Sequence, residues 1–97
     1  MEQKTLPRLV IINWEDAISP THGWTSVDEV KSQLADCISI GVVIAEDSKT
    51  ITIVSHMSGD ESSTDIDGSL VLDKTWIKNI KRLPIPRPLL KKLKGWL

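Results

Sequence analysis

The chain contains no phenylalanine and no tyrosine, and its four aromatic residues are all tryptophans. A hydrophobic core therefore has to be built mainly from valine, isoleucine and leucine, with Trp14, Trp24 and Trp76 as the large side chains. Cys37 is the only cysteine, which excludes an intramolecular disulfide. Its apolar neighbours Ile38 and Ile40 predict a buried, unreactive thiol.

Residues that carry catalysis or bind metals are also scarce, with only His22 and His56 as histidines. Ser55 and His56 are adjacent, and adjacent residues on a strand point to opposite faces, so they make a poor nucleophile–base pair. Neither zinc-type spacing nor a glycine-rich phosphate loop is present, and the acids of 60–67 do not follow a calcium-loop pattern. We therefore expect a non-enzymatic protein with no cofactor, no metal and no small-molecule substrate.

Long apolar stretches are missing as well. No run reaches the roughly 18 apolar residues of a membrane-spanning helix. The first residues, Met1 to Lys4, lack the basic-then-apolar layout of a signal peptide. The sequence predicts a cytoplasmic protein for which a membrane is an unfavoured partner.

Charge is present in balance but is divided unevenly along the chain. Residues 1–68 carry four bases against twelve acids, a net charge of −8, whereas residues 69–97 carry eight bases against Asp73 alone, a net charge of +7. Such asymmetry indicates an interaction tail or a dipolar surface.

The 97 residues leave room for one small domain. Alternating or β-branched apolar runs predict strands at 9–14, 37–44, 50–54, 69–72 and 77–83, with a tight hairpin between the second and third. A single helical turn is expected at Asp73–Trp76. The acidic, serine-rich segment 58–68 is predicted to be a mobile loop.

This order of elements predicts a mainly β fold. The expected architecture is a small Src-homology-3-like or Sm-like bent barrel of four to five strands, with one short helix and a C-terminal basic amphipathic tail. Ser26 and Glu29 have the spacing of a capping box, and Val27, Val30 and Leu34 lie at helical spacing. A small α+β roll is the alternative if a 26–34 helix packs into the core.

Four segments resemble a group of small bacteriophage-encoded proteins of unsettled function. They are 14–19 (WEDAIS), 23–24 (GW), 40–46 (IGVVIAE) and 77–80 (IKNI), so that the resemblance spans roughly residues 8–83. It implies a phage or prophage origin, a β-rich fold and location in the host-cell cytoplasm. It supplies no chemistry, and the tail lies outside it.

The tail is the first candidate site. Three prolines at 84, 86 and 88 disfavour helix before them, so we expect a barrel domain at 1–83 and a stiff linker with a tail helix at 84–97. One arc of the helix is apolar and the rest is basic, which suits binding. The candidate binding residues are Arg87, Leu89, Leu90, Lys91, Lys92, Leu93, Lys94, Trp96 and Leu97.

The first loop is the second candidate site, with Trp14, Asp16 and Trp24 as its residues. Tryptophan is enriched at binding hot spots, although the ring of Trp14 or Trp24 would equally fill a core that lacks phenylalanine and tyrosine. The leading hypothesis is an accessory protein that binds a host protein, of inhibitor or anti-defence type, through the tail or this loop. The alternatives are a structural protein whose tail bridges subunits of a homo-oligomer and, more weakly, a nucleic-acid-binding module.

Overall fold

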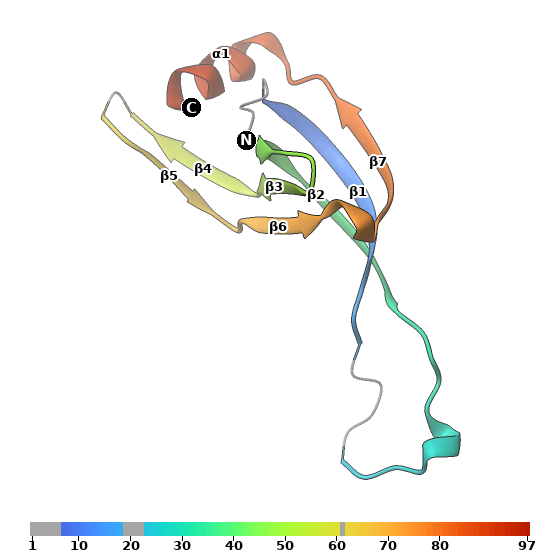
Figure 1. Cartoon of the computed structure of the whole chain (residues 1–97). Helices are drawn as coiled ribbons and strands as arrows, with labels where there is room; N and C mark the ends of the chain where they lie inside the picture. Colours follow the sequence, from blue (N-terminus) through green and yellow to red (C-terminus); the bar gives the residue numbers. More distant parts are fainter. Residues whose placement is uncertain (1–6, 19–22, 61) are drawn as a thin grey trace.

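Antiparallel β-structure makes up most of the protein, whose computed structural model describes residues 7–18, 23–60 and 62–97 (Figure 1). Five strands form one sheet in the order β6-β3-β2-β1-β7, and the strands β4 and β5 form a separate hairpin. The strands are β1 (Arg8–Asp16), β2 (Ala35–Glu46), β3 (Thr50–Val54), β4 (His56–Gly59), β5 (Thr64–Asp67), β6 (Leu70–Asp73) and β7 (Ile77–Leu83), and the helix is α1 (Arg87–Trp96).

The prediction of a mainly β fold is confirmed, whereas closure of the sheet is not observed. Among the described residues, the edge strands β6 and β7 are not paired with each other, so the sheet remains open. The short 3-10 helix Lys74–Trp76 joins these edges, as the sequence predicts, and the Asp73 side chain caps it by accepting a hydrogen bond from the Thr75 amide.

Successive side chains of a strand point to opposite faces of the sheet, so burial alternates along β1 and one face turns inward. On β1, Val10 and Ile12 are fully buried and Trp14 is nearly so. They pack with Val43, Ile51, Ile53 and Leu72 from β2, β3 and β6. Cys37 is half-buried against this core rather than fully buried. The core is thus aliphatic with one tryptophan; Trp24 does not contribute to it.

Strand β2 bends across the sheet at a point where there is no space for a side chain. A Cβ atom on Gly41 would lie 2.8 Å from the Val54 carbonyl oxygen and 3.2 Å from the Ile53 Cβ. The register between β2 and β3 also shifts between Val43 and Ala45. Glycine and bulge together let β2 pair with β1 over its first part and with β3 over its last part.

Two local predictions were wrong. The segment 26–34 forms only a 3-10 helix at Val27–Glu29 with no buried residue, and Ser26 makes no side-chain cap. The α+β alternative therefore fails, because valines spaced for a helix have no core beside them. The segment 58–68 is largely the β4–β5 hairpin rather than a loop, since Asp60 accepts hydrogen bonds from the amides of Ser62 and Ser63 and fixes the turn.

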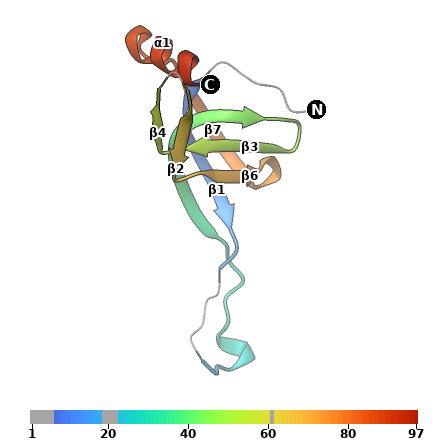
Figure 2. The ribbon, with the colours of Figure 1, turned by 90° about the vertical axis from the view of Figure 1, so that its left-hand side faces the viewer.

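The molecule is elongated. Its extents are 57 × 27 × 23 Å and its radius of gyration is 17.2 Å, against about 13 Å for a compact chain of this length. The paired ends of β1 and β2 project from the sheet as an arm, which we define as residues 15–18 and 23–38. Figures 1 and 2 show the arm at one end of the molecule and α1 at the other. No helix in the described ranges has the length and apolarity needed to cross a membrane.

Candidate functional site

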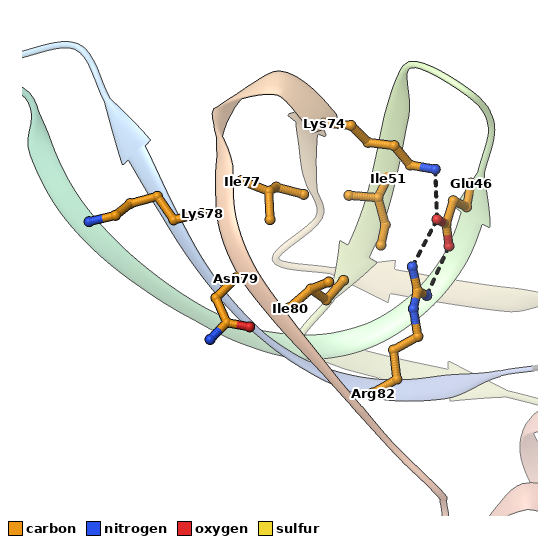
Figure 3. A pocket seen from close by; sticks show the side chains of 8 residues that line it. All are labelled: Glu46, Ile51, Lys74, Ile77, Lys78, Asn79, Ile80 and Arg82. Atoms are coloured by element: carbon orange, nitrogen blue, oxygen red, sulfur yellow. Dashed lines mark hydrogen bonds and ion pairs between the residues drawn. The ribbon is translucent and has the colours of Figure 1, made fainter.

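Three surface features are candidate sites: the mouth of the open sheet, the groove beneath α1, and the arm. The mouth is a cavity of about 430 Å³ lined by Glu46, Ile51, Lys74, Ile77, Lys78, Asn79, Ile80 and Arg82 (Figure 3). Its charged groups are already paired. The Arg82 guanidinium donates to both Glu46 oxygens at 3.0 and 2.9 Å, and Lys74 Nζ lies 2.7 Å from Glu46 Oε2.

The electrostatics of the mouth are those of a structural ion cluster. Burial tends to raise the pKa of Glu46, but the hydrogen bonds from Arg82 and Lys74 outweigh it and lower the pKa below its ordinary value. Glu46 is therefore held as a carboxylate between two cations. Since Lys74 follows β6 and Arg82 belongs to β7, the cluster links the two open edges through side chains. It strengthens the body and offers no unsatisfied group for a ligand.

The predicted tail helix forms and lies on its own chain. Pro88 is in the first turn of α1, where a proline is tolerated because its missing N–H needs no partner. At the other end of the helix, the Trp96 ring lies directly over Gly59 of β4, so that a Cβ there would approach the ring to 2.6 Å. The Thr64 hydroxyl of β5 donates to the Trp96 carbonyl at 2.5 Å. The β4–β5 hairpin thus provides the support for the helix.

A groove remains between α1 and the body. It encloses about 330 Å³, and its walls are largely apolar: Leu9, Val42, Val54, Ser55, Met57, Ile85, Pro86, Leu89, Lys92, Leu93 and Trp96. No residue of α1 is fully buried, and Leu89 and Leu97 stay exposed. The apolar face of the helix is therefore only partly covered by the body, and the groove beside it has room for a large side chain.

Only some of the basic residues of the tail lie at this groove. Lys92 lies on its wall, with Nζ 5.9 Å from the centre of the Trp96 ring. Arg87, Lys91 and Lys94 are exposed around the helix. The structure thus brings all of the predicted tail residues to one end of the molecule.

The first-loop candidates are separated by the structure. Trp14 is a core residue, only 9% exposed, that stacks on Trp76 with ring centres 6.4 Å apart. Its indole N–H donates to the Ser39 hydroxyl at 3.0 Å, so its polar atom is satisfied. Asp16 is exposed and accepts from the Ala17 amide. Trp24 is fully exposed, at 104% of its reference area.

Several other apolar side chains of the arm are exposed as well. Val27 is 89% and Ile38 is 70% exposed, and further exposed apolar side chains are Ile18, Val30 and Leu34. Val27, Val30 and Leu34 were noted for their helical spacing, with packing into the core only in the α+β alternative, and Ile38 lay in a predicted strand, so sequence reasoning did not identify these residues as exposed. Their presence in an otherwise polar segment was the available signal.

The base of the arm is fixed to the body. Residues from Arg8 to Asp16 pair in register with residues from Val43 back to Ala35. The side-chain amide of Asn13 donates to Asp36 Oδ1 at 2.6 Å. Lys78 Nζ of β7 lies 3.5 Å from Glu15 Oε1 and 3.6 Å from Asp36 Oδ1. The arm therefore presents its apolar residues at the end of a paired strand ladder.

Comparison with protein-family models, characterised proteins and solved structures finds no match to this chain. Within the described ranges, no three His, Cys, Asp or Glu side chains lie close enough together to hold a metal ion. Of the three features, the arm and the groove expose large apolar side chains, whereas the mouth is occupied by an ion cluster that is paired within the chain.

Proposed function

We propose that this chain is a non-enzymatic accessory protein of the bacteriophage type, which acts by binding another protein through its arm. The observation that carries the proposal is the complete exposure of Trp24 in the projecting arm, beyond the last paired residues of β1 and β2, in a segment where Val27 and Leu34 are exposed too. Several large apolar side chains exposed in one projecting segment indicate an interaction site.

Energetics favour a protein partner over other classes. Burying an aliphatic side chain contributes about 1.5–3 kcal/mol, and a tryptophan adds a large rigid surface with one hydrogen-bond donor. Five acids against Lys31 between residues 15 and 38 make the arm repel nucleic acid and anionic membranes. A protein surface with an apolar pocket and a basic rim is the matching partner.

The fold is proposed to be a variant of the Src-homology-3-like or Sm-like barrel. The order β6-β3-β2-β1-β7, the strongly bent β2 and the 3-10 turn before β7 support this kinship. In this interpretation the arm is an extended first hairpin of the barrel. Such a barrel serves as the rigid support on which the arm is displayed.

The protein partner belongs to one of two classes, a bacterial host protein or another copy of this chain. The sequence resemblance to phage proteins favours a bacterial host protein. The second class, another copy of this chain in a homo-oligomer, is favoured by a specific observation: the acidic arm and the basic helix lie at opposite ends of the molecule (Figures 1 and 2). A nucleic-acid role for the tail is the weaker alternative, because the groove beside the tail helix is largely apolar, with Lys92 as the one base on its wall.

Site-specific photocrosslinking tests the proposal. A photoreactive amino acid replaces Val27 on the arm, and in a matched control it replaces Val71, which is exposed on β6. Irradiation in bacterial lysate is expected to give a discrete protein adduct at position 27 and none at position 71. Trp24→Ala should remove the adduct.

The mass of the adduct identifies the class of partner. A doubled mass indicates a second copy of the chain, and any other mass indicates a different protein. Equal labelling at positions 27 and 71, or adducts that persist in Trp24→Ala, would show that the arm is not a specific binding surface.

A further inference from the structure

The two surfaces with unfilled apolar area differ in shape. The arm is convex and ends in side chains such as Trp24 and Val27, which contact nothing of their own body. The groove beneath α1 is concave, and its walls include Leu89, Leu93 and Trp96. Its volume of about 330 Å³ falls at the small end of natural ligand pockets, about 300–1,000 Å³, which suits one large side chain.

Their charges are also opposite. Between residues 15 and 38 the chain has five acids and one base, whereas residues 87–97 have Arg87 and three lysines with no acid. Two of the arm's acids, Asp28 and Glu29, lie in the 3-10 turn close to Trp24. Docking an arm into a groove would therefore bring carboxylates to a helix of opposite net charge, with Lys92 on the wall of the apolar groove, and such charge complementarity is common at protein interfaces.

Within one molecule these surfaces cannot meet. The arm projects away from the body along the long axis, which is 57 Å, and α1 lies at the far end (Figures 1 and 2). The strand pairing of Arg8–Asp16 with Ala35–Val43 keeps the arm extended. Only the arm of another copy can reach the groove.

We propose that the partner of the arm is the groove of a second copy of this chain, with Trp24 of one molecule seated against Leu89 and Leu93 of the next. This inference rests on the proposed protein binding by the arm and names the surface to which the arm binds. Because the two surfaces differ, the contact is heterologous, and repetition produces a ring or an open filament. Each copy then fills the groove of one neighbour and buries its arm in another.

A mixing experiment with two variants tests this arrangement. Trp24→Ala removes the arm's anchor and keeps the groove, whereas Leu89→Asp damages the groove and keeps the arm. Leu89 is exposed, and circular dichroism checks that the helix is retained. By light scattering, the wild type is expected to gain mass over a roughly hundredfold rise in concentration. Each variant alone should remain monomeric, and their mixture should give a 1:1 dimer and nothing larger.

Charge reversal supplies a second test that leaves the apolar side chains of the groove unchanged. Asp28→Lys with Glu29→Lys, or Lys92→Glu on the wall of the groove, should each weaken assembly at least tenfold. Mixing the two variants should restore binding between the reversed arm and the reversed wall. Reversal of Asp65, an exposed acid on β5, is the control and should leave assembly unchanged.

The outcomes distinguish docking in the groove of a second copy from protein binding by the arm in general. Assembly of Leu89→Asp equal to the wild type would show that arms bind one another and would overturn docking in the groove. A monomeric wild type whose photoreactive arm still captures a different protein would overturn the second copy as partner and leave protein binding by the arm standing. A monomeric wild type with no adduct at position 27 would overturn both.

Discussion

Strand β2 runs through two regions, the body and the arm, which differ in how far they bury aliphatic side chains. In the body, Val43 is fully buried among the core residues, whereas five positions earlier, in the arm, Ile38 is 70% exposed. The body thus uses its aliphatic residues for stability, and the arm carries aliphatic residues and Trp24 that stabilise nothing in their own chain. Apolar surface that the fold does not use is the reason why the arm is the proposed binding surface.

The largest expected effect on stability comes from a substitution in the core of the body. Ile12→Ala removes a fully buried side chain from the centre of the core and should lower the free energy of unfolding by about 2–5 kcal/mol. Ile38→Ala, the same substitution in the arm, should change it by less than about 0.5 kcal/mol. Urea unfolding followed by tryptophan fluorescence measures both. Equal losses would mean that the arm is packed in solution.

A smaller loss is expected at the bend of β2. Gly41→Ala places a methyl group 2.8 Å from the Val54 carbonyl oxygen, so β2 and β3 must separate. We expect the free energy of unfolding to fall by about 1–3 kcal/mol, as for other overpacked sites. Gly95→Ala is the control, because a Cβ there meets nothing within 4 Å. A neutral Gly41→Ala would show that the two strands are less closely packed.

The ion cluster at the mouth should contribute less than the core. Arg82→Ala removes both hydrogen bonds to Glu46 and should lower the free energy of unfolding by about 1 kcal/mol, since the pair is partly open to solvent. Lys81→Ala, an exposed residue beside it on β7, is the matched control. If both variants unfold at the same urea concentration as the wild type, the link between β6 and β7 is not stabilising.

Much of the body was predictable because its strands follow local rules. Short alternating or β-branched apolar runs located β1, β2, β3, β6 and β7, and Asp73 marked the 3-10 turn through its capping spacing. Closure of the barrel was not predictable in this way, because it depends on how far the sheet curls. Here the gap between β6 and β7 is spanned by side chains around Glu46 instead of backbone hydrogen bonds.

The candidate sites were predictable only in part. The amphipathic pattern of 89–97 located the tail helix, but its support, the β4–β5 hairpin, is held by an Asp60 turn in a segment with almost no apolar residues. In the first loop, tryptophan alone did not distinguish a core residue from a surface residue. The distinction comes from register: Trp14 lies in β1 opposite Cys37 on the inward face, whereas Trp24 lies beyond the last paired residues.

Acid should weaken the body gradually. Hydrogen bonds from the Thr50 and Lys49 amides lower the pKa of Asp47, the Thr75 hydroxyl and amide lower that of Asp73, and the cluster lowers that of Glu46. Carboxyls with a lowered pKa stabilise fully above their ordinary values, 3.8 for aspartate and 4.5 for glutamate, and lose this contribution as pH falls through the lowered value. Urea midpoints should therefore drop below about pH 4. Asp47→Asn should make that drop shallower; an unchanged profile would contradict the turn geometry.

The smallest effect on stability should accompany the largest effect on binding. Trp24→Ala removes a fully exposed ring, so the free energy of unfolding should change by less than about 0.5 kcal/mol, while the adduct at position 27 and the gain in mass with concentration disappear. Trp76→Ala is the matched control: its ring stacks on Trp14 in the body, so it should lose stability and keep binding. Only a residue outside the core can separate the two readouts in this direction. A Trp24→Ala protein that unfolds more easily and binds as before would place Trp24 with Trp14 as a structural residue.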